Sequence, residues 1–320
     1  MEAGGPPGVG GPERPEPPPT LPERTGLEDE IDRMRDLVSK WVEACHPEMR
    51  EMARYQLASG SRYFRPVAAF ACHRAVTDGA PNDHLVPVSA AIELFHNYAT
   101  ILDDINERGR YRRGKLALHC RYGRLHALMT GGYLVLGAND FLAGDAYATR
   151  VFTDLGKRVA AVEVRKWRLR HQAVGLDVWR EVAEEDTGGM FASCARVATR
   201  DERLARFGYL LGSLYRGCGD VADLRERAGL GTHRERAGRD RGLTLPGVIA
   251  GADPATAKLL GAQDDTRAEE LESRLLEALP QAESVLDEIT HEAEEEARTN
   301  APSPDGLIEL VRATRELSGG

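Results

Sequence analysis

Several features that assign a chain to a class of protein are missing from this sequence. Its five cysteines are odd in number and scattered without a CxxC pair, which argues against a disulfide framework or a zinc site. No apolar run approaches the roughly 18 residues of a membrane span, and the N-terminus lacks the basic-then-apolar order of a signal peptide. The formal net charge of −9 does not suit nucleic acid or an anionic membrane. We therefore expect a soluble, cytoplasmic protein with reduced thiols that binds no nucleic acid.

Runs of alternating β-branched residues between turns, the pattern of a β-sheet, are also missing. Instead, apolar residues recur at the three- and four-residue spacing of helices. The helical segments are 27–45, 85–102, 120–148, 151–171, 178–199, 202–224 and 265–297. Hydrophobic residues make up 42% of the chain, enough for one large core. The sequence predicts an all-α fold, a single large helical bundle over residues 27–320.

The first 26 residues, MEAGGPPGVGGPERPEPPPTLPERTG, are mostly glycine, proline and charge. This composition cannot bury enough apolar surface to offset the chain entropy, so we expect a disordered tail. A dispensable extension and a docking peptide for a partner are both compatible with it.

The most informative stretch is ELFHNYATILDDINERGRYRR, residues 93–113. On a helix, Asp103 and Glu107 share one face at i and i+4, with Asp104 beside them. Clustered carboxylates without histidine or cysteine favour Mg²⁺, which binds through a few carboxylates and substrate phosphates. Arg112 and Arg113 can grip phosphate oxygens as planar forks. The stretch predicts Mg²⁺ and a diphosphate substrate; a helix end decorated with salt bridges is the alternative.

A second acidic pair follows later, in an apolar helix over residues 207–229. Asp220 and Asp223 lie at i and i+3, so two helices with acidic ends would be able to face each other across a cavity. A capping or surface role explains the pair equally well. The basic stretch 157–172 is interpreted as an ordinary amphipathic helix.

Four elements of the chain together resemble the trans-isoprenyl diphosphate synthase (polyprenyl synthetase) family, from about Leu27 to the C-terminus. GSRYFRP (60–66) is similar to the GGKxxRP motif of the family, and the stretch 93–113 is similar to its first aspartate-rich region, with Glu107 for the last aspartate of DDxxD. The resemblance implies an all-helical fold around a deep central cavity, three Mg²⁺ ions and usually a homodimer.

The resemblance also implies an activity, the joining of isopentenyl diphosphate to an allylic diphosphate, and roles in it for particular residues. The implied catalytic residues are Asp103, Asp104 and Arg112. The implied metal ligands are Asp103, Asp104, Glu107, Asp220 and Asp223. The implied isopentenyl diphosphate-binding residues are Arg62, Arg65, His96 and Arg113. Tyr98 and Ala99, five and four residues before Asp103, would set the length of the product at about 15 to 20 carbons.

The second half of the chain departs from the family. The second DDxxD motif reads GDVAD, a lysine-threonine pair reads Asp186-Thr187, and the glutamine before the second motif is Arg216. Gly131-Gly132 stands for Gly-Asp, and the loop 225–246 is rich in arginine. These changes affect the expected third metal ion and the contacts with the allylic substrate.

Three functions remain compatible with the sequence. The chain is a prenyltransferase that elongates its substrate, a terpene synthase that ionises an allylic diphosphate, or a weak or inactive subunit that partners an active synthase. A terpene synthase has no reason to retain an isopentenyl diphosphate site, so its retention here favours the transferase.

Overall fold

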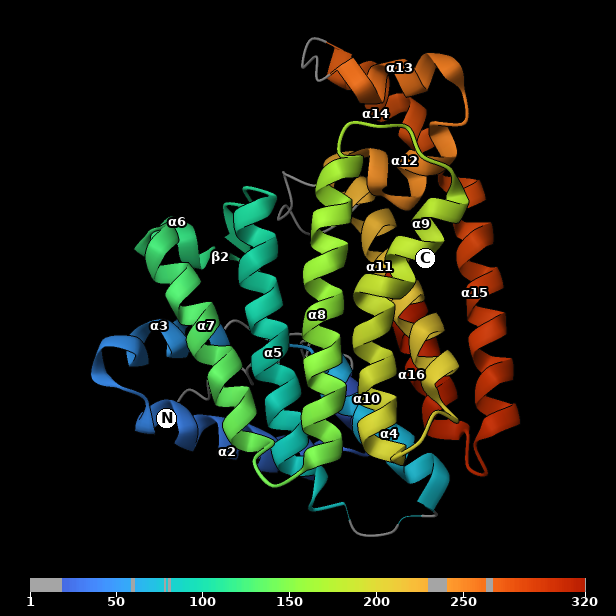
Figure 1. The fold of residues 1–320 in the computed structure, drawn as a ribbon. Helices are drawn as coiled ribbons and strands as arrows, with labels where there is room; N and C mark the ends of the chain where they lie inside the picture. The colour runs from blue at the N-terminus through green and yellow to red at the C-terminus, as the bar shows by residue number, and fades with distance from the viewer. Residues whose placement is uncertain are drawn as a thin grey trace, which may run out of the picture.

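A computed structural model describes residues 19–58, 61–77, 79, 82–229, 241–262 and 267–319. Within these ranges the chain is helical almost throughout, and its long helices run roughly parallel to one another (Figure 1). The first half consists of α1 (Leu21–Thr25), α2 (Glu28–Ala44), α3 (Pro47–Leu57), α4 (Phe64–Thr77), α5 (Leu85–Asn106), α6 (Leu118–Tyr122), α7 (Arg124–Phe141) and α8 (Ala146–Leu169).

The second half begins with α9 (Leu176–Ala183), which continues through a π-helical turn, η1 (Glu184–Gly188), into α10 (Gly189–Thr199). The remaining elements are α11 (Ala205–Arg227), η2 (Arg241–Leu243), α12 (Leu245–Ala250), α13 (Pro254–Ala262), α14 (Ala268–Glu277), α15 (Leu279–Asn300), α16 (Asp305–Arg315) and η4 (Glu316–Ser318).

The strands of the described residues form one short antiparallel hairpin, β1 (Tyr111–Arg112) and β2 (Lys115–Leu116). The two residues between them, Arg113 and Gly114, both have positive φ, at 50° and 75°. Such a turn matches the right-handed twist of paired strands, and its second position suits glycine because it has no Cβ. The hairpin directly follows the end of α5.

The buried apolar side chains from α1 to α16 form one connected core. Helix α5 packs against α7, α2 and α4, whereas α11 packs against α10 and α15. A smaller core lies at one end of the molecule, where α12, α13 and α14 cover the end of α11. The predicted all-α bundle is therefore confirmed, although α3, α4, α12, α13 and α16 were not among the helices expected from apolar spacing.

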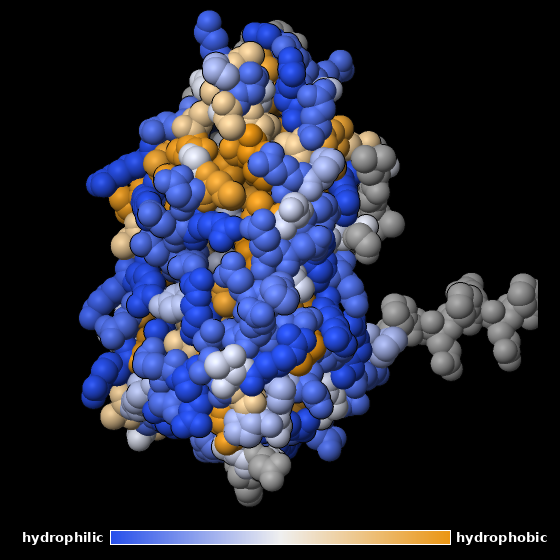
Figure 2. All heavy atoms as spheres, turned by 90° about the vertical axis from the view of Figure 1, so that its right-hand side faces the viewer, coloured by the Kyte–Doolittle hydropathy of each residue, from blue (hydrophilic) through white to orange (hydrophobic). Residues whose placement is uncertain are grey.

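The expectation that no segment is long and apolar enough to span a membrane was wrong for α5. This helix has the length and mean hydropathy, 1.2 over its most apolar window, of a membrane-spanning helix, but 67% of that window is buried inside the molecule. This burial is typical of the central helix of a core. Figure 2 shows a mainly polar outer face with an apolar area towards the α12–α14 end.

The predicted tail is too long at its C-terminal end. Residues 1–18 lie outside the described residues, but Leu21 of α1 is buried in the core. Thr20 and Glu23 form a reciprocal cap at the start of α1. Arg24 donates to Glu309 of α16 at 2.7 Å. The folded body therefore includes α1, which the composition of the first 26 residues did not indicate.

Candidate active site

The C-terminal end of α5 carries the first acidic motif. The side chain of Asp103 is 38% exposed, whereas that of Asp104 is 5% exposed. Neighbouring residues on a helix point about 100° apart, so the two carboxylates face different surroundings. Glu107 follows as the C-terminal capping residue, and its N–H donates to the carbonyl of Asp103 at 2.8 Å. Asp103 and Glu107 thus share a face, as their spacing predicts.

Asp104 is engaged by the hairpin that follows α5. The Arg112 guanidinium of β1 donates to Asp104 Oδ1 from Nε at 3.0 Å and from Nη2 at 2.5 Å. Burial by itself would lower the pKa of Arg112, but Asp104 and the neighbouring acids raise it overall. The predicted metal ligand Asp104 and the predicted phosphate ligand Arg112 therefore neutralise each other in this structure.

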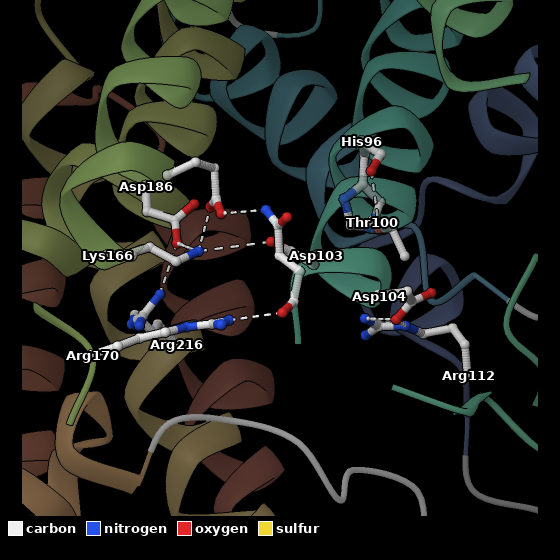
Figure 3. A network of polar contacts seen from close by, with 11 residues as sticks. His96, Thr100, Asp103, Asp104, Arg112, Lys166, Arg170, Asp186 and Arg216 are labelled. Atoms are coloured by element: carbon white, nitrogen blue, oxygen red, sulfur yellow. Dashed lines mark hydrogen bonds and ion pairs between the residues drawn. The ribbon is translucent and has the colours of Figure 1, made fainter. Parts of the chain in front are cut away.

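Asp103 points the other way, into a network of charges with Lys166 of α8 at its centre (Figure 3). The Lys166 ammonium lies 3.6 Å from Asp103 Oδ1 and 3.2 Å from Asp186 Oδ2, and it also donates to Glu163. Burial raises the pKa of Asp103 even though Lys166 acts to lower it. Lys166 is itself 14% exposed. The interpretation of residues 157–172 as an ordinary amphipathic helix missed this inward-facing lysine.

Asp186 and Arg216, two residues that the resemblance marks as departures from the family, form an ion pair. Arg216 Nη1 donates to Asp186 Oδ2 at 2.7 Å. Burial opposes the charge on Asp186, but Lys166 and Arg216 overcome this effect and lower its pKa. An acid at residue 186 and a base at residue 216 thus form a matched pair.

Glycines bring these two side chains together. Gly208, Gly212 and Arg216 are four residues apart and share one face of α11. A Cβ added to Gly212 would lie 2.5 Å from the Cα of Gly188 in η1, and one on Gly208 would lie 2.4 Å from the Cα of Ala192 in α10. Only glycine permits this close approach of α11 to η1 and α10. Arg216, one turn further along, therefore meets Asp186.

The second acidic motif has a structural role in this fold. Asp220 is 1% exposed, and its Oδ2 accepts the indole N–H of Trp179 at 3.2 Å and the backbone N–H of Leu245 at 2.9 Å. Asp220 thereby ties α9 and the start of α12 to α11. Asp223 is also buried, 8% exposed. Of the two explanations for this pair, the contacts of Asp220 match the capping role.

The two acidic helix ends do line a common pocket. Its lining residues are Asn106, Glu107, Glu163, Lys166, Trp167, Arg170, Arg216, Asp220, Leu243 and Thr244. Within the described ranges, however, no three Asp, Glu, His or Cys side chains are gathered closely enough to hold a metal ion. In this structure Asp104 and Asp220 hold other protein groups, so the five-carboxylate metal centre stays a prediction.

Of the residues expected to bind isopentenyl diphosphate, His96 lies two turns before Asp103 on α5 and meets Arg65 of α4. Arg65 of α4 is 8% exposed, and its Nη1 lies 3.3 Å from His96 Nε2. Its guanidinium lies over the rings of Phe191 and Tyr215, at 5.1 and 5.4 Å from their centroids. Stacking of this kind fixes a planar fork in one orientation. Arg62 is exposed, and Gly60, which precedes it in the motif, lies outside the described residues.

Arg113 completes this basic group together with a residue that the sequence analysis overlooked. Glu93 of α5 is 4% exposed, and burial raises its pKa although Arg113 and Arg65 act to lower it. Asn97 donates to Glu93 Oε1 at 3.2 Å. The sequence does contain a signal for this residue, because Glu93 is the one acid among the apolar residues of IELFH. Glu93 interacts electrostatically with both Arg65 and Arg113.

Tyr98 packs against α7. A Cβ on Gly131 of α7 would lie 3.2 Å from Tyr98 Cδ2, and the ring of Phe95 lies 5.7 Å from that of Tyr98. The glycine at residue 131 therefore makes room for the tyrosine. Tyr98 and Ala99 are both half-buried, and neither lines the pocket shared by Glu107 and Asp220.

Comparison with known proteins connects this site to one family. Residues 46–270 match the family model for polyprenyl synthetase. The chain is 25% identical over 219 residues to a geranylgeranyl diphosphate synthase of Methanosarcina mazei, a match that covers 62% of this chain and 67% of the relative. It is also 25% identical over 205 residues to a nonaprenyl diphosphate synthase of Mycobacterium tuberculosis, and here the match covers 61% of each protein.

The fold has close counterparts among solved structures. A polyprenyl synthase from Caulobacter crescentus, solved with calcium and isoprenyl diphosphate, superposes with a TM-score of 0.81 at 21% identity. The superposition covers 95% of this chain and 99% of the other. At this level of identity the likeness establishes the isoprenyl synthase fold.

Proposed function

Because the chain belongs to the polyprenyl synthetase family, we propose that it is a prenyltransferase that condenses isopentenyl diphosphate with an allylic diphosphate. The observation that carries this proposal is that one helix, α5, presents an acidic group at its end and a basic group two turns earlier. Asp103 and Glu107 end α5, and His96 lies two turns earlier beside buried Arg65. Seven residues of α-helix span about 10 Å, room for two diphosphates to bind side by side.

The proposal assigns the allylic diphosphate to the acidic end. Asp103 and Glu107 fit a Mg²⁺ ion, because Mg²⁺ commonly takes one or two carboxylates and completes its sphere with phosphate oxygens and water. Mg²⁺ bound there would neutralise the charge that builds up on a departing diphosphate. Arg170, which lines the same pocket and donates to the Asn106 carbonyl at 2.8 Å, supplies a further cation.

The second substrate, isopentenyl diphosphate, would bind to the basic group. The stacked Arg65, together with His96 and Arg113, presents donors for its phosphate oxygens, and exposed Arg62 is available at the edge. The surrounding apolar side chains of α4, α5 and α10 would exclude water from an allylic cation. This group is the chief argument against a terpene synthase.

We further propose a short product, of about 15 to 20 carbons, because the half-buried ring of Tyr98 occupies space between α5 and α7. The two relatives named above carry names that imply different product lengths, so this assignment rests on Tyr98. A cytoplasmic location accords with five cysteines that form no disulfide.

A homodimer is proposed from the outer face of α7. Leu125, Leu128, Met129 and Leu136 are large apolar side chains between 43% and 67% exposed, all on this helix. A second copy would bury them, and an active synthase subunit would do the same in a heteromer. The first 18 residues are the remaining candidate for partner binding.

A second candidate function, a non-catalytic subunit, is favoured by one observation. Asp104 is bound to Arg112, and Asp186 is bound to Lys166 and Arg216, so much of the charge near the pocket is already neutralised. A subunit that binds no diphosphate would tolerate these pairs.

The deciding assay supplies the purified protein with Mg²⁺, isopentenyl diphosphate and dimethylallyl or geranyl diphosphate. We expect release of diphosphate and a longer prenyl diphosphate. A parallel reaction without isopentenyl diphosphate should give no hydrocarbon or terpene alcohol; such a product would identify a terpene synthase. If no product forms with any of these substrates, the non-catalytic subunit is favoured.

A further inference from the structure

The ammonium of Lys166 is enclosed by carboxylates from three different elements. Asp103 comes from α5, Glu163 from α8 itself and Asp186 from η1, and each forms an ion pair with Lys166 (Figure 3). The lysine side chain is 14% exposed, and Glu163 and Asp186 are 15% and 19% exposed. Lys166 is therefore a nearly enclosed cation.

Such an arrangement needs a cation at its centre. Three carboxylates that converge on one point repel each other strongly when water is largely excluded. A divalent metal ion is the usual solution, with oxygen ligands at about 2.1 Å for Mg²⁺. Here the oxygens of Asp103 and Asp186 lie 3.6 and 3.2 Å from the Lys166 nitrogen. The ammonium therefore fills the centre, in close contact with Glu163, and keeps Asp103 and Asp186 farther from it than a metal ion would.

Further contacts hold the carboxylates around Lys166 in place. Glu163 is held from its other oxygen by the Asn106 amide, at 3.3 Å, so it cannot turn freely away. Asp186 is held by Arg216 at 2.7 Å. Lys166, which lines the pocket, thus links the end of α5 to η1.

We propose that Lys166 is a built-in cation that takes the place of a metal ion between Asp103 and Asp186. As a positioning residue, it holds the end of α5 against η1 and leaves divalent metal binding to the Asp103–Glu107 face. Its part in catalysis rests on the proposed prenyltransferase function, but the ion-binding property itself does not.

The test removes the ammonium and counts metal ions without any substrate. The full chain and its Lys166→Gln variant are titrated with Mn²⁺, and free Mn²⁺ is followed by electron paramagnetic resonance. We expect the variant to bind about one more Mn²⁺ per chain than the wild type, because the three carboxylates can then close around the ion. Mg²⁺ should compete for the gained site.

Two matched variants define the control. Lys166→Arg keeps a positive charge at the centre and should gain no site. Lys157→Gln makes the same chemical change on an exposed part of α8, where Lys157 is 74% exposed, and should also gain none. Equal Mn²⁺ counts in Lys166→Gln and the wild type would overturn the proposal.

Thermal unfolding gives a second measurement. Without metal, Lys166→Gln should melt below the wild type, because its carboxylates repel each other. Millimolar Mg²⁺ should recover most of the loss in this variant and leave Lys166→Arg unchanged. A variant that stays unfolded at saturating Mg²⁺ would also count against the proposal. If the extra Mn²⁺ appears in a chain without prenyltransferase activity, the proposed function fails while this inference stands.

Discussion

Asp186 of η1 and Arg216 of α11 form an ion pair of 2.7 Å at a place where the glycines of α11 bring the two elements into contact. Both side chains are mostly buried, so each needs an opposite charge beside it. The pair shows that the acid at residue 186 and the base at residue 216 satisfy each other's charge.

Breaking this pair should destabilise the protein measurably. Arg216→Gln should lower the free energy of unfolding by about 1 to 2 kcal/mol, because the pair is mostly removed from water. Arg206→Gln provides the control: Arg206 pairs with Glu184 between the same two elements, but the two side chains are 48% and 39% exposed. Its loss should be at most about 0.5 kcal/mol. Equal losses in urea unfolding would show that the Asp186 pair is no stronger than a surface pair.

Substitutions in the two acidic motifs should have different effects, one mainly on activity and the other mainly on stability. Asp103→Asn should reduce prenyl transfer by about a hundredfold or more through loss of a metal ligand, with a smaller loss of stability than Asp220→Asn, because Asp103 is partly exposed and lies 3.6 Å from Lys166. Asp220→Asn should lower the free energy of unfolding by about 1 to 3 kcal/mol, because Asp220 accepts hydrogen bonds from Trp179 and Leu245. If Asp220→Asn leaves stability intact and abolishes activity instead, Asp220 is a metal ligand after all.

Arg65 should not tolerate lysine. Arg65→Lys removes the planar group that lies over Phe191 and Tyr215, so KM for isopentenyl diphosphate should rise about tenfold or more. KM for the allylic substrate should stay near the wild-type value. Arg35→Lys is the matched control, because Arg35 lies over the ring of Tyr63 with a 58% exposed side chain. A rise in KM for both substrates in Arg65→Lys would place Arg65 outside the isopentenyl diphosphate site.

Product length should respond to Tyr98. Tyr98→Ala removes the ring that packs beside Gly131 between α5 and α7, and the product should lengthen by one or more five-carbon units. Chromatography of the dephosphorylated alcohols gives the chain length directly. Tyr147→Ala, at the start of α8, removes a tyrosine elsewhere and should leave the distribution unchanged. An unaltered distribution in Tyr98→Ala would mean that another side chain ends the cavity.

The N-terminus of α8 should give a pH-dependent contribution to stability. Asp145 accepts hydrogen bonds from Arg200 at 2.7 and 2.6 Å and caps α8 through the Ala148 N–H. The Arg200 hydrogen bonds lower the pKa of Asp145. The resulting stability is present above the unfolded pKa of about 3.9 and is lost as the pH falls through the lower folded value.

Asp145→Asn should therefore cost about 0.5 to 1 kcal/mol at pH 7, since asparagine keeps the cap but loses the charge. The difference from the wild type should shrink to near zero at about pH 2 to 3. Asp140→Asn, an exposed change at the end of α7, should show no such dependence. A wild-type advantage that is constant across this range would exclude a contribution from the Asp145 charge.

Much of the candidate site could be predicted from the spacing of residues along one helix. The i, i+4 relation of Asp103 and Glu107 and the placement of His96 two turns earlier follow from the geometry of one helix, and the structure has that helix at Leu85–Asn106. Helical periodicity also indicated the all-α fold. These features depend on residues that are close in the chain.

The features that the sequence did not indicate depend on which side chains of other elements pack against each helix. Periodicity identified the apolar face of α8 but not that Lys166 would meet Asp103 and Asp186. The letters GDVAD suggested a damaged metal motif, whereas Asp220 is used to hold Trp179 and Leu245. Arg112 was expected to bind phosphate, yet a hairpin of two-residue strands turns it back onto Asp104. Each outcome is set by a partner distant in sequence.

The hairpin after α5 has a consequence for ligand binding. Arg112 holds Asp104 at one end of α5, and the next residue, Arg113, interacts electrostatically with Glu93 three turns earlier on the same helix. One peptide bond therefore connects the two proposed substrate sites. A ligand that draws Arg112 away from Asp104 must also shift Arg113 relative to Glu93. Occupancy of one site would then change the affinity of the other, and by linkage the second ligand would change the affinity for the first by the same factor.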